Sequence, residues 1–285
     1  MHKNTPLTLS VVIPAYNEEE NIPGSLRLLW EKLDASGIDY ELVVVNDNST
    51  DATASVLADL ALENPRIRRV DRIPPRGFGR AVRAGIDAAV GDVIVLYMAD
   101  ASDNPADVVL YYNEICNGYD CVFGSRFIKG SKVSNYPSVK LLVNRLVNTM
   151  LRLLFWTRFN DLSNSFKAYR SYVLRECGPF RASHFNITIE LSLSAIIRNY
   201  NILQVPISWQ GRTWGSSNLH LREMGRRYLS TLIKIYFEKT LIRDDIIAEC
   251  VGHRGSSSEK YGELTSRMNV LEARLAALER DDGRA

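Results

Sequence analysis

Short apolar runs alternate with helical patterns over the first 126 residues of the chain. The runs are rich in valine and isoleucine, and three are nearly continuous, which is typical of strands covered on both faces. They predict strands over residues 9–16, 40–47, 66–72, 91–98 and 119–126. The segments between them predict helices over 18–36, 49–63, 79–90 and 105–117. Repeated strand–helix units indicate an α/β fold with a Rossmann-like, mostly parallel sheet flanked by helices, in which ligands bind beyond the carboxyl ends of the strands.

The regular alternation of strand and helix patterns ends after residue 126. The pattern then predicts a loop over 127–136, an amphipathic helix over 139–158, a strand over 164–170, a helix over 186–198, a strand over 202–210, a loop over 211–218 and a long amphipathic helix over 225–243. We interpret residues 1–245 as one domain, with one half over about 8–126 and a second half over about 127–245.

The carboxy-terminal tail has a different pattern. Residues 246–260 contain the polar stretch HRGSSSEK and predict a linker, and residues 261–285 predict a short helix. Apolar residues of this helix recur at alternating spacings of three and four, at Tyr261, Leu264, Met268, Leu271, Leu275 and Leu278. This is a coiled-coil seam of about two and a half heptads. Because so short a helix is marginal alone, we expect it to join copies of the chain into a homo-oligomer, with a solitary tail helix as the alternative.

Composition excludes several classes of protein. The 285 residues are 46% hydrophobic and 24% charged, as in ordinary globular proteins, and the net charge of +2 does not favour nucleic acid as a partner. Four cysteines without metal-ligand spacing indicate free thiols in a reducing cytoplasm. No signal peptide is evident, and no uncharged apolar run approaches the roughly 18–20 residues of a membrane span. We therefore expect a cytoplasmic protein.

Two segments are both apolar and basic. Residues 139–158 interrupt their leucines with Arg145 and Arg152, and residues 225–243 are similar. Each segment either lies on a membrane surface or packs on its own domain.

Polar residues follow four of the predicted strands. Each of these groups alone is an ordinary cap or first turn of a helix. Together they put carboxylates at three neighbouring strand ends, where like charges repel. A ligand with hydroxyl groups, base N–H donors and a metal-bound diphosphate explains this arrangement. The groups are Tyr16-Asn17-Glu18, residues 46–51, Asp100 with Asp103, and Ser125-Arg126.

Other nucleotide-binding and catalytic motifs are absent or weak. No GxGxxG follows the first strand, and no GxxxxGK[ST] occurs. Gly77, Gly79 and Gly85 follow the third strand, where they are a weak signal because a loop and a helix start explain them better. The four histidines are scattered, and we expect none to be catalytic.

A set of motifs resembles one family. The segments VVIPAYNEEENI, VVVNDNSTDAT, RGFGRAVRAGI, VIVLYMADASDNP, VFGSR, DLSNSFKAYR and PISWQGRTWGSSN occur in this order within about residues 8–240. They resemble glycosyltransferase family 2 and, within it, the dolichol-phosphate or polyprenyl-phosphate mannose synthase group. The resemblance implies a GT-A fold, a nucleotide-sugar donor, Mg²⁺ or Mn²⁺, and inversion at the anomeric carbon. It also implies that residues of about 8–126 bind the donor and those of about 127–245 bind the acceptor.

The resemblance implies roles for individual residues. Pro14, Tyr16 and Glu18 would contact the nucleoside, with Val45 and Asp47 near the base. The family's acidic motif falls on Met98-Ala99-Asp100, so that Asp100 matches the metal ligand while Met98 replaces an aspartate. Ser102 and Asp103 are candidate supplementary ligands. Arg126 would face the phosphates. Lys140 and Asn144 would contact the acceptor phosphate, and Arg212 and Asn218 match the loop that closes over the donor. All fifteen positions lie between residues 14 and 218.

The acceptor decides whether a base is needed. A polyprenyl phosphate is already an anionic nucleophile near neutral pH, and it needs cations such as Arg126, Lys140 and Arg212 rather than a base. A sugar hydroxyl would need a carboxylate base, for which Asp161 and Glu190 are the candidates. Pairing with a nearby arginine is the alternative role of both.

We predict an inverting, metal-dependent hexosyltransferase that moves mannose or glucose from a GDP- or UDP-linked donor to dolichyl, undecaprenyl or another polyprenyl phosphate. It would sit peripherally on the cytoplasmic face of a membrane. One alternative is a saccharide or glycolipid hydroxyl acceptor in polysaccharide or glycolipid synthesis. A second is a nucleotide-binding homologue without catalysis, motivated by Met98 and Asn218.

Overall fold

The described part of the chain comprises residues 7–211 and 221–252 in a computed structural model, and within the second range the side chains of residues 225–242 are described. The chain divides into two compact units, Met1–Tyr236 and Phe237–Ala285, whose boundary falls inside the helix α8 (Leu221–Gly252). In the second unit the described residues continue this helix. Arg212, Asn218 and the predicted heptad helix lie outside the described residues.

A central sheet organises the first unit. Within the described residues it has seven strands in the order β3-β2-β1-β4-β7-β5-β8. All neighbouring pairs are parallel except those of β7, which runs antiparallel to both β4 and β5. A second, two-stranded sheet pairs β6 and β9 in parallel. The strands are β1 (Leu9–Ala15), β2 (Tyr40–Asn46), β3 (Ile67–Asp71), β4 (Val93–Leu96), β5 (Cys121–Ser125), β6 (Lys132–Ser134), β7 (Lys167–Arg170), β8 (Ile202–Pro206) and β9 (Ser208–Gln210).

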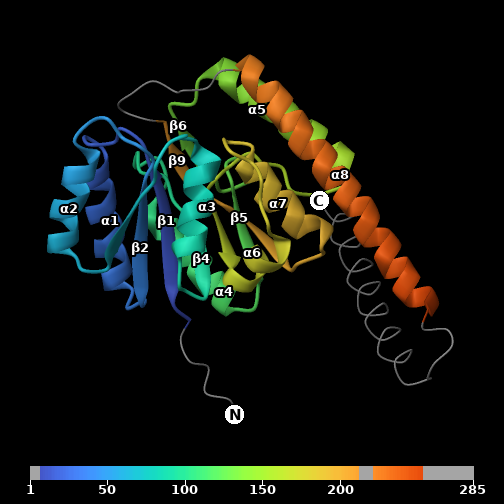
Figure 1. Cartoon of the computed structure of the whole chain (residues 1–285), viewed down its shortest axis with the longest axis horizontal. Helices are drawn as coiled ribbons and strands as arrows, with labels where there is room; N and C mark the ends of the chain where they lie inside the picture. The colour runs from blue at the N-terminus through green and yellow to red at the C-terminus, as the bar shows by residue number, and fades with distance from the viewer. Residues whose placement is uncertain (1–6, 212–220, 253–285) are drawn as a thin grey trace, which may run out of the picture. The chain divides into compact units, whose positions relative to one another are not determined.

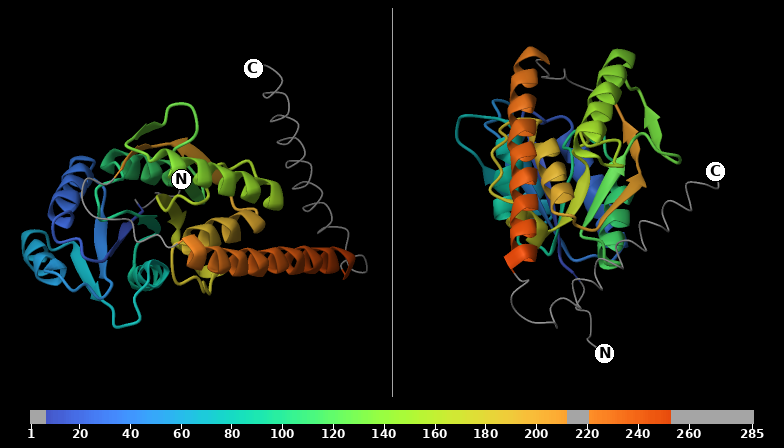
Figure 2. Two further views of the ribbon diagram at one scale, coloured as in Figure 1. Left: turned by 90° about the horizontal axis from the view of Figure 1, so that it is seen from above. Right: turned by 90° about the vertical axis from the view of Figure 1, so that its right-hand side faces the viewer.

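Helices cover both faces of the central sheet. Figure 1 shows α3 (Phe78–Ala88) and α7 (Ile187–Ile197) in front of the strands, and α3 packs on β1 and β2. On the other face α1 (Ile22–Ala35) packs with α4 (Pro105–Cys116), as the view from above confirms (Figure 2). The remaining helices of the described chain are α2 (Thr53–Glu63), α5 (Ser138–Phe155), α6 (Ser171–Cys177) and α8.

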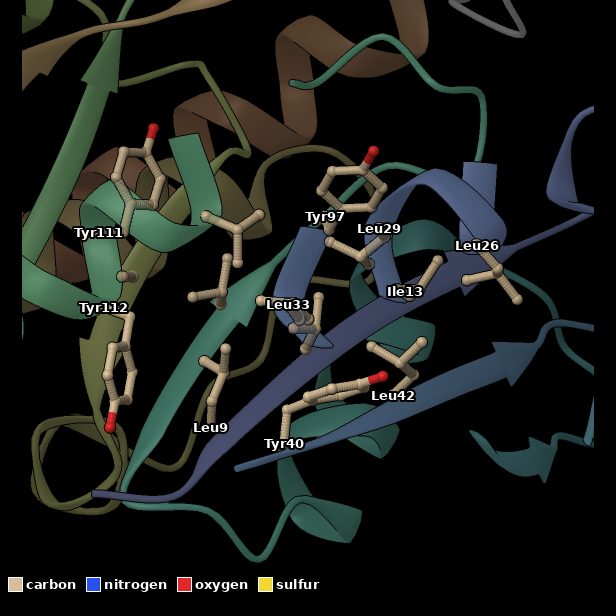
Figure 3. Packing of buried hydrophobic residues seen from close by; sticks show 14 of the residues in the cluster. Leu9, Ile13, Leu26, Leu29, Leu33, Tyr40, Leu42, Tyr97, Tyr111 and Tyr112 are labelled. Carbon is tan, nitrogen blue, oxygen red and sulfur yellow. The ribbon is translucent and has the colours of Figure 1, made fainter. Parts of the chain in front are cut away.

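Apolar side chains between α1, α4 and the sheet form the main core. Every residue of β1 and β4 is buried, as the nearly continuous apolar runs predict. Figure 3 shows leucines of α1 lying against β1 and β2, with aromatic rings of β2, α4 and the end of β4 around them. The labelled residues are Leu9, Ile13, Leu26, Leu29, Leu33, Tyr40, Leu42, Tyr97, Tyr111 and Tyr112. This packing holds the carboxyl ends of the strands in place.

The first two helices begin later than predicted. Asn17 and Asn48 both take the left-handed conformation, at φ +53° and +61°, and turns occupy the next residues. As a result α1 begins at Ile22 rather than residue 18, and α2 at Thr53 rather than residue 49. The polar residues that we took for first turns lie in loops at the strand ends instead.

The second half also differs in detail from the prediction. The predicted loop over 127–136 contains β6, the predicted strand over 202–210 divides into β8 and β9, and α6 was not predicted. The helix α8 continues to Gly252 and therefore covers residues 246–252, which we had assigned to the linker. The mostly parallel α/β architecture itself is as predicted.

Candidate active site

The loop after β4 folds around its own carboxylates. The Ser102 N–H donates to Asp100 Oδ1 at 3.1 Å, and the Met98 N–H donates to Asp103 Oδ2 at 3.2 Å. The Tyr97 hydroxyl donates to the Asp103 carbonyl at 3.0 Å. Asp100, Ser102 and Asp103 are all buried. The segment predicted to bind metal is thus a tight turn that brings two carboxylates together at the carboxyl end of β4.

The short strand β9 closes over this acidic loop. The Gln210 N–H donates to the Ser102 carbonyl at 3.0 Å, and Trp209 forms an isolated antiparallel bridge with Asp103. Since β6 pairs with β9, the second sheet covers the acidic loop from the acceptor half of the chain.

The chemistry of Asp100 and Asp103 fits a divalent cation. Burial, and then the charge of Asp100, raises the pKa of Asp103 to about 8. A cation bound at this loop would offset the repulsion between the carboxylates, and hard cations prefer such oxygen ligands. Within residues 7–211 and 221–252, no group of three or more histidine, cysteine, aspartate or glutamate residues could hold a metal ion. The site fits Mg²⁺ or Mn²⁺, which can take most ligands from water and phosphate oxygens.

Asp47 lies at the carboxyl end of β2 and is oriented by two donors. Its Oδ2 accepts the Gly77 N–H at 2.6 Å, and its Oδ1 accepts a hydrogen bond from the guanidinium of Arg72. Asp47 is buried, and the side chain of Arg72 is largely so. The predicted base-contacting carboxylate is therefore held by the residue that follows β3 and by the turn that starts α3.

Hydrogen bonds join the loops after β1 and β2. The Asn17 side-chain carbonyl accepts the Thr50 N–H at 2.8 Å, and the Glu18 N–H donates to Thr53 Oγ1 at 2.9 Å. The Glu18 carboxylate accepts from Asn21 Nδ2 at 2.7 Å. These contacts fix the two predicted nucleoside-binding loops relative to each other.

Of the other predicted nucleoside contacts, Tyr16 alone is partly exposed. The Arg76 guanidinium lies over its ring, 4.4 Å from the centroid. Pro14 and Val45 are partners across β1 and β2, and both are buried. Ala99 is buried in the main core. The side chains of these three residues therefore pack inside the protein at the strand ends.

Arg126 is bound to Asp161 in a buried, two-pronged ion pair. Its Nε and Nη2 donate to the two carboxylate oxygens of Asp161, each at 2.8 Å, and its backbone N–H donates to Oδ2 at 3.0 Å. The rings of Phe127, Tyr136 and Trp209 lie around the guanidinium, with centroids 5.4–5.7 Å away. The sequence placed Arg126 against phosphates, but its neighbours here are a carboxylate and aromatic rings. Asp161 is one of the two candidate bases, and both of its carboxylate oxygens accept hydrogen bonds from Arg126.

Lys167 is a buried cation that the sequence reasoning missed. Its Nζ donates to the Leu162 carbonyl at 2.8 Å and to the Asn164 carbonyl, so it ties down the loop that carries Asp161. Burial lowers the pKa of Lys167 to about 7; Asp161 opposes this shift and Arg126 adds to it. A lysine inside an otherwise apolar strand pattern was the signal that could have found it.

Arg72 and Arg76 were missed as well. Arg72 is the last residue of the third predicted strand and directly follows β3, so the same rule of polar residues at strand ends would have identified it. Arg76 adjoins the glycine-containing segment that we judged weak.

The helix α5 brings Asn144 to the Asp161 loop. Asn144 Oδ1 accepts from Ser163 Oγ at 2.9 Å, and Asn144 Nδ2 donates to the Tyr136 hydroxyl at 2.8 Å. Lys140 is exposed one turn earlier on α5. The two predicted acceptor-phosphate residues thus occupy different environments, one in a hydrogen-bond network and one at the surface.

Glu190 lies in the first turn of α7. Its carboxylate accepts the N–H groups of Arg181, at 3.1 and 3.0 Å, and of Ala182, at 2.7 Å. Lys234 Nζ of α8 donates to it at 2.6 Å. Glu190 is buried, and these contacts fit a structural anchor better than a general base.

The fold and this arrangement of strand ends define a nucleotide-sugar glycosyltransferase of the GT-A type. The chain belongs to glycosyl transferase family 2, whose sequence model matches residues 10–178. The predictions of fold and of enzyme class are thereby confirmed.

Two curated relatives name a more specific activity. The chain is 30% identical over 215 residues to the polyprenol monophosphomannose synthase of Mycolicibacterium smegmatis, covering 73% of this chain and 80% of that protein. It is 31% identical over 220 residues to the dolichol-phosphate mannosyltransferase of Pyrococcus furiosus, covering 75% of this chain but 59% of that protein.

Solved structures of a different synthase share the fold. Glucosyl-3-phosphoglycerate synthase from Mycobacterium tuberculosis, in complex with Mn²⁺, UDP and glucosyl-3-phosphoglycerate, superposes with a TM-score of 0.62 at 25% identity over 80% of each chain. The same enzyme with Mg²⁺ and UDP gives a TM-score of 0.60 at 26% identity, over 80% of this chain and 79% of that chain. These neighbours bind a nucleotide together with the kind of ion that the acidic loop fits.

Proposed function

We propose that this protein transfers a hexose, mannose or glucose, from a GDP- or UDP-linked donor to polyprenyl phosphate, with inversion. The observation that carries the proposal is the buried Asp100–Asp103 loop at the end of β4, in a chain 30% identical to a polyprenol monophosphomannose synthase.

The donor would bind across the ends of β1, β2 and β4. Asp100, supplemented by Asp103, would hold Mg²⁺ or Mn²⁺, which when bound supplies charge stabilisation for the leaving nucleoside diphosphate. Asp47, fixed by Arg72 and Gly77, is an oriented acceptor for the N–H groups of a base. The ring of Tyr16 offers a stacking surface for the base. Because Met98 stands where the family's acidic motif has an aspartate, Asp100 is the main ligand.

The contacts of the two candidate bases favour a phosphate acceptor over a hydroxyl. Both oxygens of Asp161 bind Arg126, and the carboxylate of Glu190 accepts two backbone N–H groups and the ammonium of Lys234. A phosphate nucleophile is already anionic and needs neither carboxylate. It needs cations, and Lys140 is exposed on α5 for this role, while that of Arg212 stays a prediction.

A lipid-linked acceptor calls for contact with a membrane. Within the described residues, no helix has the length and hydropathy to cross a bilayer. The helix α5 buries Asn148, Leu151 and Phe155 against the domain. Its opposite face exposes large apolar side chains, at Val139, Leu142, Val143, Leu146, Met150, Leu153 and Leu154. Since the exposed Arg145 and Arg152 flank this face, it is suited to lie on an anionic membrane surface.

A donor and acceptor screen tests the proposal. Purified full-length protein is incubated with GDP-mannose, GDP-glucose or UDP-glucose, with Mn²⁺ or Mg²⁺, and with either polyprenyl phosphate or a polyprenyl glycolipid lacking a free phosphate. We expect metal-dependent formation of a polyprenyl phosphohexose with one donor, detected by mass spectrometry. Transfer only to the glycolipid hydroxyl would support the alternative acceptor, and no transfer with any donor would contradict the proposal.

A further inference from the structure

Glu190 stands at the centre of contacts that lead from α8 to the donor side of the sheet. On one side it binds Lys234 of α8, and nearby Asn186 Nδ2 donates to Thr231 Oγ1 at 2.9 Å, so α8 is attached to α7 twice. On the other side its carboxylate holds the N–H groups of Arg181 and Ala182, which open the segment 181–184 that precedes α7. A buried carboxylate with three donors fixes that segment strongly.

The segment 181–184 lies directly against the start of α3. The Gly79 N–H donates to the Ser183 carbonyl at 3.1 Å, and a Cβ at Gly79 would come within 2.5 Å of the Ala182 carbonyl oxygen. A Cβ at Gly77 would lie 2.4 Å from the Ser183 carbonyl oxygen. The rings of Phe78 and Phe185 stack with centroids 4.4 Å apart. The two glycines therefore serve this close approach of backbone to backbone.

The start of α3 in turn orients Asp47. The Gly77 N–H donates to Asp47 Oδ2 at 2.6 Å, whereas Asn48 Nδ2 approaches Oδ1 only to 3.5 Å. A shift of residues 181–184 would move Gly77 and thereby this carboxylate. The contacts are continuous from Lys234 through Glu190, the segment 181–184 and Gly77 to Asp47.

We propose that Glu190 is a positioning residue for donor binding. It fixes the segment 181–184, which holds the Gly77 N–H against the Asp47 carboxylate. Its ion pair with Lys234 makes the position of this N–H depend on α8. The proposal rests on the assignment of Asp47 to the nucleotide under the proposed function. In this role Glu190 takes no part in proton transfer. A displacement of α8 at the protein surface would change the affinity for the donor.

Two variants separate this role from that of a general base. Glu190→Gln keeps the size of the side chain but removes its charge, and Lys234→Met removes the ion pair from the surface side. In each we expect donor KM, and the Kd of GDP and UDP with Mn²⁺ measured by calorimetry, to rise about 5- to 10-fold for the nucleotide that the wild type binds. We expect kcat at saturating donor to stay within about twofold and its pH profile to be unchanged. The double variant should show the effect of one substitution rather than the product of two, because both act through one contact.

A matched control and a second readout complete the test. Arg226→Met removes an exposed cation two turns earlier on α8 and should leave the donor constants unchanged. Hydrogen exchange at the amides of Ala182, Gly77 and Gly79 should be faster in both test variants, without any nucleotide present. These exchange rates test the coupling between Glu190 and the start of α3 directly, whether or not Asp47 binds the donor.

The outcomes that overturn the proposal are specific. A general base would lose about 10²–10⁴-fold in kcat in Glu190→Gln with donor KM unchanged. A purely local anchor would show faster exchange at Ala182 but not at Gly77 and Gly79, with unaltered donor binding.

Discussion

At the scale of single residues, the site is built on buried charges that are paired or held by backbone groups. Arg126 and Asp161 compensate each other, and Asp47 is held by Arg72. Lys167 differs because its Nζ donates to two backbone carbonyl groups, those of Leu162 and Asn164. Burying an ammonium in this way disfavours its charged form.

Lys167 gives a testable dependence of stability on pH. Its pKa is lowered from the ordinary 10.5 to about 7, so between these values the unfolded chain binds a proton that the folded protein does not. The free energy of unfolding should therefore rise with pH over this window relative to Lys167→Met, by up to about 1.4 kcal/mol per pH unit. Urea unfolding at pH 7 to 9 measures the difference.

Lys129→Met, which removes an exposed lysine, is the control for this experiment and should run parallel to the wild type. Parallel curves for Lys167→Met as well would show that Lys167 stays protonated in the folded protein.

The individual contacts could be predicted only in part. Asp100 and Asp47 follow apolar strands, so the rule of strand ends located them. The Arg126–Asp161 pair joins residues 35 positions apart, and nothing in the local pattern indicates that they meet. Glu190 carries the same chemical group as a catalytic base, and only its three donors reveal the anchor.

At the scale of elements, β7 and α5 show where a hydrophobic pattern stops being informative. A short apolar strand reads the same in both directions, so the pattern could not show that β7 lies antiparallel between β4 and β5. The late starts of α1 and α2 depend on left-handed asparagines, which sequence spacing does not reveal. The pattern of α5 showed an apolar and basic helix, but not which face the domain covers.

The exposed face of α5 leads to a prediction about membranes. Leu142, Leu146 and Leu153 are each 70–73% exposed, so replacing all three by serine should leave the fold intact. We expect the triple variant to lose at least about tenfold in its affinity for vesicles containing anionic phosphatidylglycerol, because it loses apolar surface for burial in the interface. Co-sedimentation with the vesicles measures this affinity.

A triple serine variant of Leu28, Leu62 and Val90 serves as the matched control, since these exposed residues lie on or near other helices. Equal loss of vesicle binding in both triple variants, or no loss in either, would contradict the role of α5.

At the scale of the whole molecule, the order of the motifs along the chain was more informative than any one of them. The acidic loop alone reads as a turn, and the structure shows that it is indeed a turn, closed by hydrogen bonds to its own carboxylates. Its position beside the ends of β1 and β2, and under β9, is what makes it a candidate metal site. The mostly parallel α/β architecture was predictable because repeated strand–helix units restrict the topology, and the family was predictable from the ordered set of motifs. The antiparallel insertion and the second sheet arise from long-range pairing and were not.

The most direct test of the central claim is the metal dependence of hexose transfer in Asp100→Asn. Asp59→Asn, which alters an exposed carboxylate on α2, is the matched control. With the nucleotide sugar that the wild type uses and polyprenyl phosphate as acceptor, we expect Asp59→Asn to match the wild type. We expect Asp100→Asn to lose about 100-fold or more in kcat/KM and to require more Mn²⁺ for half-maximal rate. Transfer by Asp100→Asn at the wild-type rate and metal concentration would contradict the assignment of this loop as the catalytic metal site.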